Sequence, residues 1–368
     1  MGHLLRAAAL TGALALPLGA CGDPLIVVGD SPGTLRIIAG VADLPGDSLG
    51  ATATESLLDT PLDLAAGEDG TVYIADSGNA RVLVVSPSGD IVVLVDHSDR
   101  RQEPRLHAPN GLALDGRGGL LIADPFGQRI WRLDIATADL VPIAGTGVRG
   151  TVPDSVDALQ ANLDTPTDVA VAADGRIYFT ETGAHRVRRI EADGVLVTIA
   201  GTGLAGFTGD DGPADVARLQ EPSGLVFGDG VLFIADSGNN RIRAIDLATG
   251  LIRTVAGAGA PGSSGDDGPA IEALLNAPSA LAVAADASVL YIADTDNHRV
   301  RVVNLVNRRI STFAGTGEVD FNGDLLPAGA TALSSPQGLA VSAFDLLYLS
   351  DSGHHIVRRT PVAFLGAL

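Results

Sequence analysis

Apolar runs along this chain are interrupted at near-regular intervals by an acidic residue and a tight turn of small polar residues. The phrase Ile-Ala-Asp-Ser-Gly-Asn occurs at residues 74–79 and again at 234–239, with variants between and after them. The acidic residues that end these runs recur every 48 to 58 positions: Asp76, Asp124, Glu181, Asp236, Asp294 and Asp351. A repeat of this length predicts a ring or solenoid, because each unit must bury its apolar face against a neighbouring copy.

The pattern within each unit predicts four antiparallel strands. A Leu-x-x-Pro step opens the unit, and an apolar run rich in small residues follows, as at residues 219–227. A glycine-containing turn leads into the strand that ends at the acidic residue. An alternating strand with arginine follows, as at 241–245, and the last strand carries Ile-Ala-Gly-Thr-Gly or a variant of it, as at 199–203. Six such units predict an all-β, six-bladed β-propeller with four antiparallel strands per blade.

The two ends of the chain are expected to share one blade. No Ala-Gly-Thr-Gly strand follows residues 355–359, but residues 35–40 match residues 252–257 almost position by position. The N-terminal strand should therefore complete the sixth blade and close the ring, which removes an open seam.

The repeat pattern, Pro-x-Gly-Leu-Ala-Val followed by Tyr-Ile-Ala-Asp-Ser-Gly-Asn-x-Arg-Ile-Arg, resembles the NHL-repeat family of six-bladed propellers over about residues 34–365. The Gly-Asp-Asp-Gly-Pro-Ala segments at 209–214 and 265–270 are similar to those of bacterial NHL-repeat proteins and of the NHL portion of teneurins. This resemblance implies a fold and leaves function open. The family includes scaffolds, sensor ectodomains, RNA binders and a peptide-amidating lyase, and similar propellers include gluconolactonase-like hydrolases.

The charge balance changes the expected partners. The chain has 44 acidic and 24 basic residues, a net charge of −20 and no lysine. Such a chain repels phosphate backbones, so we expect no nucleic-acid partner. We expect a monomer.

The first residues predict export and anchoring. Residues 1–20 have the pattern of a signal peptide, and Leu18-Gly19-Ala20-Cys21 resembles the lipobox of bacterial lipoproteins, in which the cysteine is lipidated. Ordinary secretion with an unmodified Cys21 is the alternative. The expected domains are a lipoprotein signal peptide at 1–20, a tether at 21–33 and one propeller at 34–368. Gly22 after the cysteine favours the outer membrane of the cell envelope, with membrane contact through the lipid anchor only.

The ring of six acidic residues invites a metal assignment, but its geometry opposes one. Strand and sheet spacings place these residues roughly 10 Å or more from the axis, whereas ligands of one Ca²⁺ lie about 2.3–2.6 Å from it. We therefore expect each carboxylate to accept backbone N–H bonds within its own turn. The same argument opposes a zinc site shared by His185, His298 and His355, which lie farther out. The arginine five residues after the acid, as in Arg241, is expected to be a structural partner.

Chemistry is more plausible where the repeat is broken near the axis. Most units place a small residue two positions after the proline, but the first and third place Asp63 and Asp168 there. These two carboxylates are candidates to bind a cation, or to act as acid and base, and the alternative is that they bond to backbone. Polar residues expected beside them, as weaker ligand-binding candidates, are Asn110, Thr167, Ser223, Ser279 and Gln337.

Two further features are weaker candidates. The Gly-Asp-Asp-Gly loops could hold Ca²⁺ as a cofactor through Asp210, Asp211, Asp266 and Asp267. The second unit replaces the Ser-Gly-Asn turn with Pro125-Phe126-Gly127 and adds Trp131, which marks either a contact patch or core packing.

These features favour a lipid-anchored, non-enzymatic binding or scaffold protein of the bacterial cell envelope. Its protein, peptide or glycan partner should dock on the acidic face, by which we mean the face formed by the turns after the second strands and the connections between blades. A concentration of acids there would attract cations or a basic partner. The alternative is a metal-dependent hydrolase or lyase of the gluconolactonase-like or peptide-amidating-lyase-like type.

Overall fold

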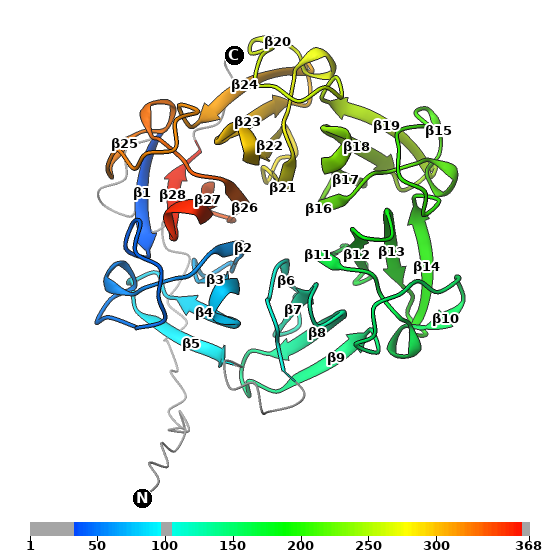
Figure 1. Ribbon diagram of the computed structural model, residues 1–368, viewed down its shortest axis with the longest axis horizontal. Helices are drawn as coiled ribbons and strands as arrows, with labels where there is room; N and C mark the ends of the chain where they lie inside the picture. Colours follow the sequence, from blue (N-terminus) through cyan, green and yellow to red (C-terminus); the bar gives the residue numbers. More distant parts are fainter. Residues whose placement is uncertain (1–32, 97–104, 363–368) are drawn as a thin grey trace, which may run out of the picture.

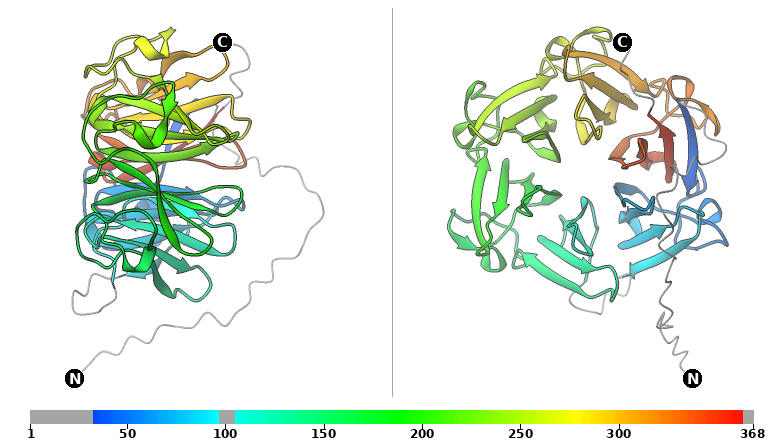
Figure 2. Two further views of the ribbon diagram at one scale, coloured as in Figure 1. Left: turned by 90° about the vertical axis from the view of Figure 1, so that its right-hand side faces the viewer. Right: turned by 180° about the vertical axis from the view of Figure 1, so that it is seen from behind.

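A ring of blades surrounds a central axis (Figure 1). The computed structural model describes residues 33–96 and 105–362, and these residues form six antiparallel sheets with no α-helix. The predicted signal peptide, Cys21 and nearly all of the predicted tether lie outside the described residues. The strands of each sheet follow one another from the axis outward, and Figure 2 shows the disc from the side and from behind.

The blades are numbered along the chain. Blade 1 contains β2 (Pro61–Ala66), β3 (Val72–Asp76), β4 (Arg81–Val85) and β5 (Ile91–Asp96). Blade 2 contains β6 (Leu112–Leu114), β7 (Gly119–Asp124), β8 (Arg129–Asp134) and β9 (Leu140–Ala144). Blade 3 contains β11 (Pro166–Val171), β12 (Ile177–Glu181), β13 (Arg186–Ile190) and β14 (Val195–Ala200).

The remaining blades follow the same order. Blade 4 contains β16 (Pro222–Gly228), β17 (Val231–Asp236), β18 (Arg241–Asp246) and β19 (Leu251–Ala256). Blade 5 contains β21 (Pro278–Val283), β22 (Val289–Asp294), β23 (Arg299–Asn304) and β24 (Arg309–Ala314). Blade 6 contains β26 (Pro336–Val341), β27 (Leu346–Asp351), β28 (Ile356–Pro361) and the N-terminal β1 (Thr34–Ala39).

The predicted ring closure is confirmed. Strand β1 pairs antiparallel with β28, with Arg36 opposite Arg359 and Ile37 opposite Arg358. In Figure 1 the dark blue β1 lies directly beside the red strands of the C-terminal end. The chain therefore closes its own ring between two segments far apart in sequence.

The expectation of four strands per blade is incomplete for blades 3 to 6. In each of these blades the connection that precedes it adds a two-residue strand outside the fourth strand. These short strands are β10 (Val156–Asp157), β15 (Gly212–Pro213), β20 (Gly268–Pro269) and β25 (Leu326–Pro327). Each precedes a single 3₁₀ turn, and the sequence pattern gave no sign that these segments would pair.

The core lies in the seams between blades. Buried apolar side chains form clusters that each span neighbouring sheets, such as one joining blades 1 and 2 around Trp131. The leucines of the Leu-x-x-Pro steps are fully buried in these seams: Leu58, Leu106, Leu163, Leu219, Leu275 and Leu333. Burial of such a side chain stabilises a fold by about 1.5–3 kcal/mol, so the repeated leucine is a main reason that the blades associate.

No helix within the described residues has the length and apolar character needed to cross a membrane.

Candidate functional site

The acidic residues at the ends of the second strands are internal. The side chains of Asp76 and Asp236 are fully buried. Asp236 accepts from the backbone N–H of Gln220 at 2.7 Å and from the side-chain amide of Asn239 at 2.8 Å. The expectation that the backbone donor comes from the same turn is therefore wrong for this residue: the backbone N–H comes from the Leu-x-x-Pro step, and the turn supplies a side-chain amide.

The same arrangement recurs around the ring, with one local exception. The carboxylates accept a backbone N–H from residues 16 to 18 positions earlier, at Asp59, His107, Asp164, Gln220, Asn276 and Ser334. Only Asp124 among these also accepts from a backbone N–H of its own turn, that of Gly127, within the described residues. In blades 1, 4, 5 and 6 the turns close as 3₁₀ turns with a left-handed residue after them, so their own N–H groups are used elsewhere.

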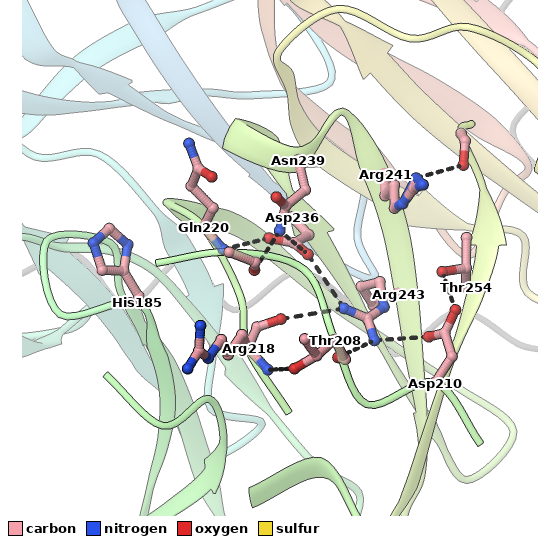
Figure 3. A network of polar contacts seen from close by, with 12 residues as sticks. His185, Thr208, Asp210, Arg218, Gln220, Asp236, Asn239, Arg241, Arg243 and Thr254 are labelled. Atoms are coloured by element: carbon pink, nitrogen blue, oxygen red, sulfur yellow. Dashed lines mark hydrogen bonds and ion pairs between the residues drawn. The ribbon is translucent and has the colours of Figure 1, made fainter. Parts of the chain in front are cut away.

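A fully buried arginine, seven residues after the acid, completes this network in blade 4 (Figure 3). Arg243 lies 3.4 Å from the carboxylate of Asp236 and donates to Asp210 at 2.7 Å, and Thr254 donates to the other oxygen of Asp210 at 2.7 Å. The arginine therefore connects the second strand, the preceding connection and the outermost strand of one blade.

Arginines equivalent to Arg243 are Arg188, Arg301 and Arg358 in blades 3, 5 and 6. The repeat pattern had instead predicted a structural role for the arginine five residues after the acid. Of that set Arg81 binds its own acid, at 2.6 Å, whereas Arg129, Arg241 and Arg299 donate to carbonyl groups at the Gly-Thr-Gly segment or its variant. The two arginines stand two residues apart in the third strand and share one face of it, so the sequence alone offered no reason to prefer either of them.

The loop aspartates have structural partners or open surroundings. Asp210 and Asp266 each bind a buried arginine and a threonine hydroxyl, which occupies the oxygens that a Ca²⁺ would need. Asp211 and Asp267 are exposed and have left-handed backbone angles. The described residues contain no group of three or more His, Cys, Asp or Glu side chains arranged to hold a metal ion.

Hydroxyl groups near the axis join successive blades. The serine or threonine after the acid donates to the carbonyl of the proline that opens the next blade, as Ser237 does to Pro278 and Ser352 to Pro61. Three of the proposed ligand-binding residues belong to this belt, because Thr167 donates to the carbonyl of Ser223 at 3.3 Å, Ser223 to that of Ser279 at 2.8 Å and Ser279 to that of Gln337 at 3.0 Å. Their hydroxyls are used for assembly of the ring.

The repeated histidines also join blades. His185, His298 and His355 each accept, through Nδ1, the backbone N–H of the residue before the opening proline of the next blade, at 3.0–3.1 Å. Gln128 and Asn240 do the same with side-chain carbonyl groups at the equivalent position. The position therefore selects a hydrogen-bond acceptor, and the histidines stand in different seams.

Asp63 and Asp168 remain as the acids that face the axis. Asp63 accepts from the backbone N–H of Leu112 in blade 2 at 2.8 Å, and Asp168 accepts from that of Leu225 in blade 4 at 2.6 Å. Each carboxylate thus reaches forward to the next blade, as the backbone-bonding interpretation expected. Gly111 lies between them, and a Cβ added there would stand 2.3 Å from a carboxylate oxygen of Asp168, so glycine is required to make room.

Protein surrounds both carboxylates, although each keeps part of its surface open to the axial space. Burial, and then the charge of Asp168, raise the pKa of Asp63 well above its ordinary value. Burial raises the pKa of Asp168 to about 7, although hydrogen bonds from the Leu225 and Val169 amides oppose the rise. Because burial opposes the charged forms, the pair binds protons more strongly than ordinary carboxyl groups do, and a bound cation would favour their release.

The two carboxylates line an axial cavity of about 270 Å³. Its other lining side chains are aliphatic or aromatic and come from the first strands, among them Leu64, Leu114 and Phe227. The cavity runs along the first strands from the carboxylates toward the hairpin turns. Asn110 and Gln337 are partly exposed but do not line this cavity, so the structure does not bring all seven predicted residues together.

Blade 2 departs most from the repeat. Trp131 is fully buried where blades 3 to 6 have the buried arginine, and it donates to Asp124 at 3.3 Å, so core packing is the correct interpretation for it. Pro125 stands where other blades have the hydroxyl of the belt. Phe126 beside it is 78% exposed on the acidic face. It belongs to blade 2, which lies between the blades of Asp63 and Asp168, and is therefore a candidate contact residue.

The face predicted to be acidic is less so than the sequence suggested. The carboxylates at the ends of the second strands are buried, and Asp210, Asp266 and Asp324 are paired with arginines or backbone. Exposed acids such as Asp211, Asp267 and Asp320 remain in the connections.

Comparisons with known proteins agree on the fold. Residues 43–205 match the family described as the teneurin NHL domain. The chloroplastic protein SUPPRESSOR OF QUENCHING 1 of Arabidopsis thaliana is 30% identical over 270 residues, covering 70% of this chain and 25% of that protein. NHL repeat-containing protein 2 of Homo sapiens is 25% identical over 323 residues, covering 78% of this chain and 44% of that protein. The chain thus spans less than half the length of these relatives.

Solved structures share the architecture at low identity. An auxiliary nutrient binding protein from Bacteroides thetaiotaomicron superposes with a TM-score of 0.64 and 14% identity, covering 89% of this chain and 75% of that chain. At this identity the likeness concerns the fold alone.

Proposed function

We propose that this chain, which belongs to the NHL-repeat family of six-bladed propellers, is a non-enzymatic binding protein that recognises a cationic group of its ligand at the axis. The ligand is a basic protein or peptide that docks on the acidic face. Fold alone does not carry this proposal, because propellers host unrelated functions.

The observation that carries the proposal is the carboxylate pair in the axial cavity. Four blades place glycine or alanine at this position, whereas Asp63 and Asp168 place acids there at the cost of burying them. The carboxylates stand nearer the acidic face than the apolar lining of the cavity does, so an arginine or lysine side chain that enters from this face brings its charged end to them first. Phe126 would add an apolar contact on the same face.

A titration with tri-arginine amide tests the proposal. The protein should bind this probe, and the affinity should fall as salt raises the ionic strength, since exposed charges are screened beyond about 8 Å at physiological ionic strength. The Asp63→Asn/Asp168→Asn double variant should keep its fold and lose most of the binding. Neutralising the exposed turn acids Asp174 and Asp193 instead is the matched control and should change the affinity little. Equal binding by both double variants would contradict the axial site.

The cellular address is a separate part of the proposal. The lipobox-like segment that ends at Cys21 supports lipid anchoring in the bacterial cell envelope, with the outer membrane as the expected site. Cells expressing the protein would be grown with labelled palmitate, and the label should enter the wild-type chain but not Cys21→Ala. Incorporation of labelled palmitate into both proteins would reject lipid anchoring at Cys21. It would not bear on the proposed axial site.

The enzymatic alternative makes a different prediction. A metal-dependent hydrolase or lyase would carry about one tightly bound Ca²⁺ or Zn²⁺ per chain, with Asp63 and Asp168 among its ligands. Elemental analysis of the purified wild type and the Asp63→Asn/Asp168→Asn variant separates the two functions, because the binding protein needs no resident metal. A stoichiometric metal lost in the variant would replace our proposal with the alternative.

A further inference from the structure

The outer edge of blade 1 is built differently from those of blades 3 to 6. In those four blades a short strand from the preceding connection pairs with the outer edge of the fourth strand, as β15 does with β19. An acid of the same connection binds the buried arginine in each of these blades, and in blades 3 to 5 it also accepts from a threonine of the fourth strand, as Asp210 does from Thr254. We call this arrangement the edge clasp.

Blade 1 has no edge clasp. Strand β5 is the outermost strand of its sheet among the described residues, and the preceding connection, residues 41–60, is described throughout. Leu83 stands at the position of the buried arginine, and Val93, its partner across the strands, stands at the position of the threonine. The blade has therefore lost the polar residues that hold the extra strand in blades 3 to 5.

The connection before blade 1 makes only one of the backbone hydrogen bonds that the connection before blade 4 makes to its blade. The N–H of Ala53 donates to the carbonyl of Gly89 at 2.9 Å, as the N–H of Ala214 does to that of Gly250 in blade 4. The N–H of Gly50, three residues earlier, donates to the hydroxyl of Ser56 at 3.0 Å instead of to the outermost strand. The rest of β5 is left uncovered by this segment.

The uncovered edge offers backbone groups and apolar side chains. In blade 4 the residue equivalent to Ile91 is Ile252, and its backbone carbonyl accepts from the N–H of Asp211 in the connection at 2.7 Å. In blade 6 the residue equivalent to Val93 is Ile37, and its backbone N–H faces outward and donates to the carboxylate of Asp324 at 2.8 Å. Within the described residues, the carbonyl of Ile91 and the N–H of Val93 have no hydrogen-bond partner.

Exposure of the side chains agrees with this. Residues equivalent to Ile91 are almost fully buried in the clasped blades: Leu196, Ile252, Ile310 and Leu35. Ile91 itself is partly exposed, Val92 is 56% exposed and Val93 is 36% exposed. An exposed edge strand of β-branched residues is a ready template for pairing with another chain.

In blade 2 a proline blocks strand pairing at the outer edge. Its outermost strand, β9, has Pro142 at the position of Val93, opposite Trp131. Proline has no N–H to donate, so it blocks pairing at the outward position. Strand β5 contains neither proline nor an internal charged residue, since its only acid is Asp96 at the last position.

We propose that β5, on the rim of the ring in Figure 1, pairs with an extended segment of a partner polypeptide whose β-branched residues are flanked by lysine or arginine. Asp90 and Asp96 bracket the edge, and the chain carries a net charge of −20, so basic flanks are complementary. A second copy of this chain is the weaker occupant. Two-fold antiparallel pairing would set Asp90 of each copy near Asp96 of the other, and like charges across strands destabilise.

The test uses a fluorescein-labelled peptide, Lys-Thr-Val-Thr-Val-Thr-Lys, followed by fluorescence polarisation. Val93→Pro, which copies the proline of β9, should weaken binding at least tenfold, as should N-methylation of alternate peptide amides. The Asp90→Lys/Asp96→Lys variant should shift preference to the same peptide with glutamate flanks, which is a gain that unfolding cannot produce. These titrations are run in the Asp63→Asn/Asp168→Asn background, so that the axial site cannot contribute to binding of this basic peptide.

The proposal fails if the N-methylated peptide binds as well as the unmethylated one, or if Val93→Pro folds and binds like wild type. Light scattering gives a further decisive outcome. A wild-type dimer that becomes a monomer with Val93→Pro would show that a second copy occupies the edge, and would overturn the choice of a basic partner.

Discussion

At the residue scale, most of the polar residues that recur in this chain assemble the ring. The acids that end the second strands, the serines after them and the histidines all bond within or between blades. The sequence pattern identified these positions because a repeat is visible in one sequence. It did not identify their partners, because a partner from the Leu-x-x-Pro step or the next blade is distant in sequence.

The axial acids are candidate site residues that the structure places at one cavity, and their role in binding stays a prediction. Asp63 and Asp168 were found because they break a position otherwise held by glycine or alanine, and the structure brings both to one cavity. Ser223 and Ser279 could not be separated from them by sequence, since their role depends on which carbonyl of the next blade lies within reach.

The first residue-scale prediction concerns pH and stability. A carboxylate whose pKa is raised by folding contributes stability that is present at low pH and lost as pH rises through the folded value. For Asp168 this window runs from its ordinary value of 3.8 to about 7. Asp63→Asn/Asp168→Asn should therefore be more stable than wild type at pH 8, on the order of 2 kcal/mol, with the difference shrinking toward pH 4.

Urea denaturation of both proteins across this pH range is the measurement. Asp134→Asn is the matched control, because hydrogen bonds from the Thr137 and Ala136 amides lower the pKa of this exposed acid. Its effect should have the opposite sign, with the variant losing stability relative to wild type as pH rises. A wild-type stability that increases between pH 4 and 7 relative to the axial double variant would refute the assignment.

The second residue-scale prediction concerns the buried arginine. Arg243→Met should destabilise the protein by about 3–5 kcal/mol, because it leaves the carboxylate of Asp236 buried without its cation. Arg253→Met on the adjacent strand is the control and should cost less than about 0.5 kcal/mol, since Arg253 is exposed. Chemical denaturation should also show partial recovery in Arg243→Met/Asp236→Asn. A double variant as unstable as the sum of both single variants would argue against the pair.

At the element scale, the predicted strands and their order are confirmed, including the N-terminal strand that completes blade 6. The alternation of apolar residues and the glycine turns fix these strands locally, which is why the sequence sufficed. The outer two-residue strands were missed because a Gly-Pro or Val-Asp pair has no strand pattern. Their pairing depends on a connection that folds back over the edge.

The element-scale prediction concerns closure. A chain that begins at Val41 lacks β1, which exposes the edge of β28 and removes the fully buried Leu35. It should be less stable by more than about 3 kcal/mol, since loss of a buried leucine side chain alone costs about 2–5 kcal/mol. A chain that begins at Gly33 keeps β1 and is the control. Identical melting curves for the two truncated chains would show that β1 does not close the ring.

At the scale of the whole molecule, the ring presents two distinct surfaces. The axial cavity with its carboxylate pair lies at the centre, and the uncovered edge of β5 lies on the rim. Sequence predicted the first through a break in the repeat. The second requires knowing which edges the connections cover, and therefore needed the structure.

The central claim is that the axial carboxylates exchange a proton for a cation. The most direct measurement is calorimetric titration with tri-arginine amide at pH 7 in buffers of different ionisation enthalpy, which counts protons released on binding. Because Asp168 has a pKa of about 7, binding should release a substantial fraction of one proton per chain and tighten from pH 6 to pH 8. Proton release and binding should both vanish in Asp63→Asn/Asp168→Asn. Binding without proton release, with an affinity independent of pH and unchanged in that variant, would contradict the account.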